Sequence, residues 1–298
     1  MTTPDGGWEL RCGSPRYPDC LEASPRPPEI LYGFGDTTLL TPGLGIVGAR
    51  RATPYGLSLA REFAAWAAAE GVTVVSGAAL GCDRAAQAAA IEAGGRTVAV
   101  LGCGADLDYP SSSRELLETL RREHAVVSEI PWKERATVHT FPARNRIIAA
   151  LSRAVLIVEA ALGSGTFSTA DHALQAGREV LVVPGSVYSD TSRGCNRLLF
   201  QGATPIADVY DLAHALAACG LCASPRRDGQ AANADLSRLD AVSQRIARAL
   251  LADPMHPDDA ARALELSVVT LMRALGYLES EFVVARYPDG RYGPCSRC

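Results

Sequence analysis

The stretch LGIVGARRATPYG, Leu44–Gly56, holds the strand-to-helix unit on which the fold of this chain is built. An apolar strand ends at Gly48, and two arginines follow shortly after it. A helix then begins near Pro54, because proline is favoured at the first helical position and Thr53 can serve as the N-cap. The stretch therefore predicts a buried strand that leads directly into a helix.

The same alternation of strand and helix continues to about residue 201. We expect valine-rich strands at VTVVS (Val72–Ser76), TVAVLG (Thr97–Gly102), AVVSE (Ala125–Glu129), AVLIVEA (Ala154–Ala160) and EVLVVPG (Glu179–Gly185). We expect helices over Asp83–Ala93, Ser112–Glu123, the RNRII segment, Thr166–Ala176 and near Cys195–Gln201. Continuous apolar strands between helices indicate a parallel sheet covered on both faces. The sequence thus predicts an α/β fold with a Rossmann-like, doubly wound, mostly parallel sheet over residues 43–218.

Other patterns flank this sheet domain. Residues 1–42 are rich in proline and turn formers and predict an irregular lead-in. Small polar residues predict a linker over 219–237. Residues 238–298 predict a small winged-helix domain, since three helical segments are followed by a strand, a Pro-Asp-Gly turn and a returning strand. The three helical segments are Asp240–Ala252, Pro257–Leu264 and Val268–Ser280.

Composition restricts the class of protein. The chain has 298 residues, of which 48% are hydrophobic, and this is enough for a large buried core. It has neither an apolar run of membrane-spanning length nor a basic, then apolar, N-terminal segment, so we expect a cytoplasmic protein with no membrane partner. The net charge of -4 means that any site for a polyanion depends on local placement of arginines.

The glycines Gly43, Gly45 and Gly48 match the dinucleotide-binding pattern GxGxxG letter by letter. That pattern must follow a strand and open a helix. Here the strand residues Ile46 and Val47 lie inside the pattern, so we reject the match.

Loops rich in glycine, serine and arginine follow four of the predicted strands. They are GARR (Gly48–Arg51), SGAALGCD (Ser76–Asp83), SE (Ser128–Glu129) and ALGSGTFSTA (Ala161–Ala170). The carboxyl ends of parallel strands meet at one edge of the sheet, where backbone N–H groups can bind an oxyanion. The segment HTFPARNRIIA, His139–Ala149, adds Arg144, Asn145 and Arg146 at the polar start of a helix. Together these segments predict a phosphate-binding surface.

The sequence contains no obvious catalytic motif. It lacks the nucleotide-binding GxxxxGK[ST] loop, the GxSxG nucleophile elbow and a histidine pair at metal-ligand spacing. Asp83, Glu129 and Glu159 lie near strand ends, but each can cap a helix or hold an arginine. We therefore expect structural roles for these three carboxylates and no enzymatic activity.

The order of these motifs resembles that of the DNA-processing protein A family (DprA, also called Smf). The matching segments are IVGARRATPYG, VVSGAALGCDRAAQ, YPSSSREL, SEIP, FPARNRIIAALS, VEAALGSGTFSTADHAL and VPGSVYSDTSRGCNRLLFQGA. The resemblance implies a homodimeric protein that binds single-stranded DNA, protects incoming DNA and loads the recombinase RecA during natural transformation. It places phosphate contacts on Gly48, Arg50, Ser76, Gly77, Arg144, Asn145, Arg146, Gly163, Ser164, Gly165 and Thr166, and a base-stacking contact on Phe141.

The chain departs from the family pattern at two places. GCDRAAQ stands where the family usually has GID followed by an Ala-His pair, so that Cys82 replaces isoleucine and Gln87 replaces histidine. The later loop has SGTFSTA where SGSLITA is more common. Both departures lie near the expected site and put its affinity for DNA in question.

Two alternatives share this architecture. Phosphoribohydrolases that act on nucleoside monophosphates use a PGGxGTxxE loop, but here Ser168 and Thr169 occupy the region of the catalytic glutamate. A nucleotide- or small-molecule-binding domain joined to a winged-helix regulator is the second alternative, because fold alone does not fix function.

The nine cysteines include two CxxC pairs. Cys219 and Cys222 follow the sheet domain, and Cys295 and Cys298 stand at the other end of the winged helix. Together they could hold a structural zinc ion. The alternative is that the spacing arises by chance in a chain whose thiols are mostly reduced, and otherwise we expect no cofactor.

Overall fold

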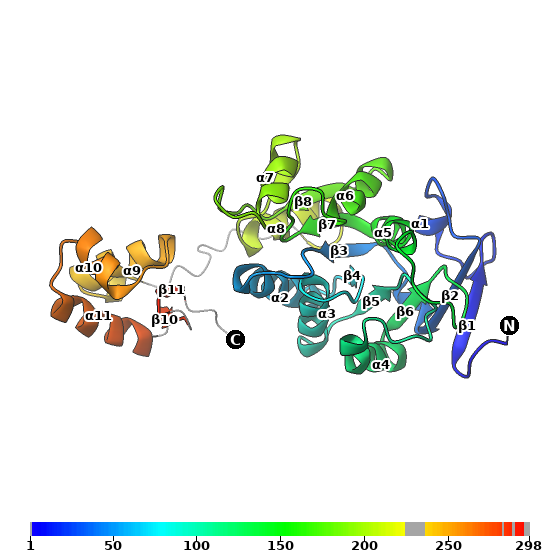
Figure 1. The fold of residues 1–298 in the computed structure, drawn as a ribbon, viewed down its shortest axis with the longest axis horizontal. Helices are drawn as coiled ribbons and strands as arrows, with labels where there is room; N and C mark the ends of the chain where they lie inside the picture. Colours follow the sequence, from blue (N-terminus) through cyan, green and yellow to red (C-terminus); the bar gives the residue numbers. More distant parts are fainter. Residues whose placement is uncertain (1, 224–235, 282, 288–289, 295–298) are drawn as a thin grey trace. The chain divides into compact units, whose positions relative to one another are not determined.

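The computed structural model describes residues 2–223, 236–281, 283–287 and 290–294 (Figure 1). The chain forms two compact units, residues 1–226 and residues 227–298. The larger unit is built on a nine-stranded sheet with the order β1-β2-β6-β5-β4-β3-β7-β8-β9. Its strands are β1 (Gly7–Arg11), β2 (Ile30–Gly35), β3 (Gly43–Val47), β4 (Val74–Ser76), β5 (Thr97–Val100), β6 (Ala125–Ser128), β7 (Ser152–Ile157), β8 (Glu179–Val182) and β9 (Thr204–Pro205).

Helices cover both faces of this sheet. One face carries α2 (Pro54–Ala69), α3 (Cys82–Glu92), α4 (Arg114–Glu123) and α8 (Val209–Ala218), and the other carries α1 (Asp19–Glu22), α5 (Thr140–Ala150), α6 (Thr166–Gln175) and α7 (Arg193–Phe200). Short 3₁₀ turns span Thr37–Leu39 and Ser111–Ser113. Successive strand residues face opposite layers, so that Leu156 packs with α2 while Val155 and Ile157 pack with α5. The predicted doubly wound α/β fold is confirmed.

In the order of the sheet, strands β6, β5, β4, β3, β7, β8 and β9 run parallel to one another. Strand β2 pairs antiparallel with both β6 and β1. The prediction of an irregular lead-in over residues 1–42 was therefore wrong. Its prolines favoured loops, but β2 adds to the free edge of β6 and so gains backbone partners that no local pattern reveals. Tyr32 and Phe34 of β2 also pack edge-on against Trp132, with ring centroids 5.3 and 5.4 Å apart.

The strand order reverses at β3, and this reversal positions the candidate site. From β3 the chain first adds β4, β5 and β6 on one side, and then α5 carries it across to β7 on the other side. Ligands of open α/β sheets bind outside the carboxyl ends of strands at such a point. At the start of α2, Thr53 accepts a hydrogen bond from the Gly56 N–H at 3.2 Å, as predicted. Gly43 and Gly45 lie within β3, which agrees with rejecting the GxGxxG match.

The second unit is a winged helix. It contains the 3₁₀ turn Leu236–Arg238, α9 (Ala241–Ala252), α10 (Pro257–Ala263), α11 (Val268–Ser280) and an antiparallel pair, β10 (Val284–Arg286) and β11 (Tyr292–Pro294). Asp240 caps α9 and Ser267 caps α11. Its helices bury their own apolar core, centred on Ile246, Leu271 and Leu278. Within the described parts of the chain, no helix has the length and apolar character needed to cross a membrane.

Candidate nucleic-acid interface

A cleft of about 480 Å³ opens at the loops that follow β3, β4 and β5. The start of α5 forms its remaining wall. The side chains that line it include Arg50, Tyr109, Phe141 and Arg144. Because the loops come from adjacent parallel strands, the cleft lies at the carboxyl edge of the sheet, where the sequence analysis expected a binding surface.

Phe141 is the centre of an aromatic and cationic stack in this cleft. The Cζ atom of Arg50 lies 4.9 Å from the centroid of the Phe141 ring. Tyr109 approaches the same ring, with centroids 5.8 Å apart and an interplanar angle of 38°. Gly102 leaves space for the ring, since a Cβ at this position would lie 3.1 Å from it. Arg50 and Tyr109 are both exposed, so the stack is open to a ligand.

Arg144 is buried beneath this stack, with only 5% of its surface exposed. Its Nη1 donates to the Val100 carbonyl at 3.3 Å and lies 3.8 Å from Oδ2 of Asp83. Its Nε atom is buried without a hydrogen-bond partner among the described residues. Burial lowers the pKa of Arg144, while the Asp83 carboxylate opposes that shift. Gly77 makes this position possible, because a Cβ there would overlap the guanidinium.

One backbone donor expected to bind phosphate, the Gly77 N–H, is occupied by Asp83. It donates to Oδ2 of Asp83 at 3.1 Å, and the nearby N–H groups of Gly48 and Ala79 act to lower the pKa of this carboxyl. Burial raises the pKa of Asp83, whereas Arg144 and the backbone donors act in the opposite direction. At Gly77 the chain's own carboxylate is thus the acceptor, and a phosphate contact at this position stays a prediction.

Ser76 and Gly48 likewise have internal roles. Ser76 is fully buried, and its hydroxyl donates to the Ile46 carbonyl at 2.6 Å. Gly48 packs against Cys82, whose Sγ would lie 2.6 Å from a Cβ at position 48. The Ser76 hydroxyl is therefore used within the protein, and phosphate contacts by Ser76 and Gly48 stay a prediction.

The three polar residues at the start of the RNRII helix do not converge on one site. Successive residues of an α-helix project about 100° apart, so they reach different neighbours. Arg144 lies under the cleft. Asn145 donates to Ser168 Oγ at 2.8 Å and to the Gly165 carbonyl at 3.2 Å, which fastens α5 to the loop before α6. Arg146 pairs with Glu129 and lines a different cavity.

The loop Gly163–Thr166 also stands apart from the side chains that line the cleft. Gly163 has a φ of +72°, a conformation that suits glycine, and it is exposed. The Ser164 hydroxyl is buried without a partner among the described residues, and Thr166 is buried at the start of α6. A phosphate contact by this loop stays a prediction.

Tyr109 is the cleft residue that the sequence analysis missed as a ligand contact. The segment YPSSSREL was noted as a motif, but nothing in its pattern brings Tyr109 against Phe141. An exposed aromatic next to proline, in the loop after a predicted strand, was the available signal.

The three carboxylates have the structural roles that were expected. Glu159 is buried and accepts hydrogen bonds at 2.8 Å from the Thr53 N–H, the Thr53 hydroxyl and the Thr191 hydroxyl. Glu129 pairs with Arg146, and Asp83 lies beside Arg144. Each of the three carboxylates thus contacts a donor or an arginine of the chain itself.

The departures from the family pattern at Cys82 and Gln87 lie in the interior. Both side chains are fully buried. The Gln87 amide accepts from the Ala78 N–H at 3.0 Å and donates to the Thr97 hydroxyl at 3.3 Å. Ala78 has a φ of +52°, so Gln87 holds a strained turn behind the cleft. Neither departure changes the surface that a ligand would touch.

The zinc hypothesis stays a prediction. Cys219 and Cys222 are half-buried, and burial raises the pKa of both thiols. Cys295 and Cys298 lie outside the described residues. Among the residues that are described, no three or more cysteine, histidine or acidic side chains cluster in a way that could hold a metal.

The fold and the cleft define a two-unit α/β protein, with a basic and aromatic cleft at the carboxyl edge of a Rossmann-like sheet and a separate winged helix. The family model for the DNA recombination-mediator protein A matches residues 9–217, and that for the DprA winged helix domain matches residues 230–290. The chain therefore belongs to the DNA recombination-mediator protein A family. The first match includes β1 and β2, the two strands that the sequence analysis missed.

Named relatives agree with this membership. Protein Smf of Synechocystis is 40% identical over 212 residues, which are 70% of this chain and 53% of that protein. DNA processing protein DprA of Bacillus subtilis is 38% identical over 201 residues, 67% of this chain and 68% of that protein. The matched part of this chain thus spans about half the length of the Synechocystis relative.

Two solved structures share the fold. The X-ray structure of DNA processing protein A from Streptococcus pneumoniae has a TM-score of 0.66 and 34% identity, covering 69% of this chain and 72% of that one. DNA processing protein A from Helicobacter pylori, whose structure is described for its single-stranded DNA binding mode, has a TM-score of 0.63 and 32% identity. That match covers 69% of this chain and 93% of the other.

Proposed function

We propose that this chain is a DNA-processing protein that binds single-stranded DNA in the cleft around Phe141. The observation that carries the proposal is the stack of the exposed Arg50 on Phe141, in the same cleft as the buried Arg144. The single-stranded DNA binding described for the Helicobacter pylori relative supports it.

The chemistry of the cleft suits single strands of any sequence. Aromatic faces such as Phe141 and Tyr109 stack on every base, with about 1–3 kcal/mol per base. The exposed guanidinium of Arg50 can bind a backbone phosphate, and this contact carries no sequence information. In a duplex the bases are already stacked within the helix and cannot reach the ring. The cleft should therefore prefer single strands to duplexes.

The proposed role is protection and delivery of DNA, without catalysis. Following the family resemblance, a homodimer in the cytoplasm would protect incoming DNA and load RecA onto it during natural transformation. The side chains lining the cleft include no carboxylate that could act as the acid or base of a hydrolase. Glu159, the buried acid at the end of β7, has its carboxylate engaged by Thr53 and Thr191.

A titration with labelled oligonucleotides tests the proposal. The full chain is mixed with single-stranded and double-stranded DNA of the same sequence over a series of salt concentrations, and fluorescence anisotropy reports binding. We expect tighter binding to the single strand and affinity that falls with salt. A parallel incubation with nucleoside monophosphates monitors release of free base. Base release, or absence of DNA binding at low salt, would favour the phosphoribohydrolase or small-ligand alternative.

A further inference from the structure

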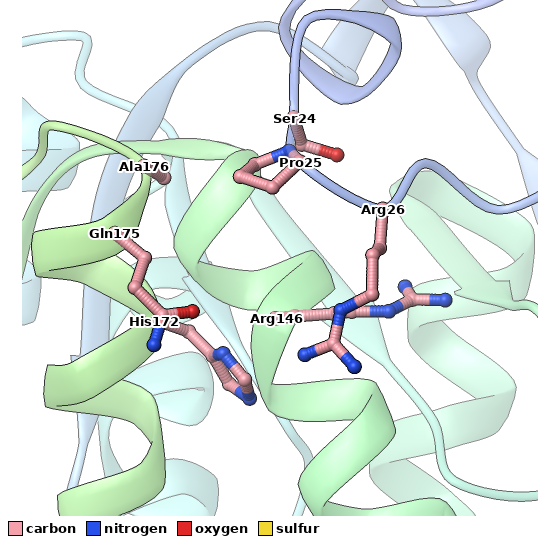
Figure 2. A pocket seen from close by; sticks show the side chains of 7 residues that line it. All are labelled: Ser24, Pro25, Arg26, Arg146, His172, Gln175 and Ala176. Carbon is pink, nitrogen blue, oxygen red and sulfur yellow. The ribbon is translucent and has the colours of Figure 1, made fainter.

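A second cavity, open to solvent, lies between the loop that follows α1 and the helices α5 and α6 (Figure 2). Arg26 reaches it from the loop, Arg146 from α5, and His172 and Gln175 from α6. Figure 2 shows the guanidinium of Arg26 and the ring of His172 directed to the same space, with the Arg146 side chain passing alongside Arg26. None of its lining residues belongs to the cleft around Phe141.

The donors around this cavity are only partly used within the protein. One terminal nitrogen of Arg146 pairs with Glu129, but the other, Nη1, is buried with no hydrogen-bond partner in the described part of the chain. A buried donor without a partner is unfavourable. Arg26 is exposed at the cavity, so its guanidinium is accessible from solvent. Glu129 pairs with Arg146, and Arg26 has no ion pair among the described residues.

We propose that Arg26, Arg146 and His172 form an anion site that takes a phosphate group. Two guanidinium groups lining one small cavity repel each other, and an anion between them would remove that repulsion. The planar fork of arginine fits phosphate oxygens through paired N–H donors, and Nη1 of Arg146 would gain the partner it lacks. His172 and Gln175 add side chains that can donate further hydrogen bonds.

The phosphate group has two possible sources, the backbone of a nucleic acid or a free phosphate or nucleotide. The site itself does not depend on the function proposed for the cleft, because the two share no side chain. A DNA strand bound at both the cleft and this cavity would contact a longer part of the same domain. A free nucleotide would instead be a separate ligand.

Inorganic phosphate is the probe for the first experiment. Isothermal titration calorimetry compares phosphate with chloride at equal ionic strength, on the full chain and on Arg26→Ala and His172→Ala. Arg16→Ala is the matched control, because Arg16 is exposed on the same N-terminal segment but does not line the cavity. We expect Arg26→Ala to weaken phosphate binding about tenfold, His172→Ala to weaken it less, and Arg16→Ala to leave it unchanged. Equal binding to wild type and Arg26→Ala, or no binding to wild type, would overturn the proposal.

A second arm identifies the source of the phosphate. Each variant is titrated with a single-stranded oligothymidylate. If Arg26→Ala weakens the binding of both phosphate and the oligonucleotide, the site holds the DNA backbone. If it weakens phosphate alone, the site holds a free phosphate or nucleotide. Repeating the calorimetry in an Arg50→Ala background separates this proposal from that for the cleft: oligonucleotide binding should already be reduced there, while adding Arg26→Ala should still weaken phosphate binding and adding Arg16→Ala should not.

Discussion

The guanidinium of Arg144 lies 3.8 Å from the carboxylate of Asp83, and both side chains are buried beneath the cleft. Asp83 also accepts a hydrogen bond from the Gly77 N–H in the loop after β4. The pair therefore joins α3 and α5 to the carboxyl edge of the sheet and fixes the floor on which the ligand would rest.

Replacing Arg144 by alanine should destabilise the protein, because Asp83 would remain as a buried charge without its partner. We expect the free energy of unfolding to fall by about 3–5 kcal/mol. Unfolding of the protein by a denaturant, followed through a signal from the sheet domain, measures this loss. Arg50→Ala is the control, since Arg50 is exposed and its removal should leave stability nearly unchanged. Equal stability of Arg144→Ala and wild type would show that the pair has no structural role.

Replacing Gly77 by alanine should displace Arg144. A Cβ at this position would overlap the guanidinium, which is itself confined by Asp83 and the Val100 carbonyl. Overpacking of this kind costs about 1–3 kcal/mol, and DNA affinity should fall with the distortion of the cleft. Thermal unfolding and oligonucleotide titration together check the result. Gly71→Ala is a poor control because of its positive φ, whereas Gly276→Ala on α11 meets open space and should be tolerated.

The histidine of the family pattern should be able to replace Gln87. Gln87 accepts from the Ala78 N–H and donates to Thr97, and a neutral imidazole has one acceptor and one donor for the same two partners. We expect Gln87→His to keep both stability and DNA binding. Gln87→Leu leaves the Ala78 N–H unsatisfied and should cost about 1–3 kcal/mol. If Gln87→Leu proved as stable as wild type, the role of Gln87 in holding the turn would be refuted.

The buried thiols should make the folded state weaker in alkaline solution. Burial raises the pKa of Cys82 and Cys195 to about 12 and that of Cys103 to about 11, from an ordinary value of 9.0. Above pH 9 the unfolded chain loses these protons first, so the free energy of unfolding should decrease as pH rises toward 11. Iodoacetamide labelling followed by peptide mass spectrometry checks the burial directly at pH 8. Half-buried Cys12 should react before any of the three, and early labelling of Cys82 would contradict the account.

The sequence predicted most of the fold because the central strands are continuous apolar runs. Val74, Val98 and Leu156 lie within segments that can only be buried, and glycine or proline marks many of the strand ends. The strands β1 and β2 were missed, since their stability comes from pairing with the edge of β6 and packing on Trp132. Such contacts join distant parts of the chain and leave no local periodicity.

The candidate site was predicted less completely. Arg50, Phe141 and Arg144 do meet at one cleft. The sequence analysis grouped Arg146 with them, but Arg146 lines a different cavity. The sequence could not show this, because the direction of each side chain depends on the rotation of α5 about its axis. Neither could the sequence reveal that the Asp83 carboxylate accepts from the Gly77 N–H, since that requires the position of α3 against β4.

Binding of labelled single-stranded DNA to Arg50→Ala, beside Arg51→Ala, tests the central claim most directly. Arg51 is the neighbouring exposed arginine and does not line the cleft, so it controls for lost charge alone. We expect Arg50→Ala to bind about tenfold more weakly for all sequences, with the salt slope reduced by about 0.7, and Arg51→Ala to bind nearly as wild type. Equal losses in the two variants, or a loss confined to particular sequences, would show that the strand does not lie on the stack of Arg50 and Phe141.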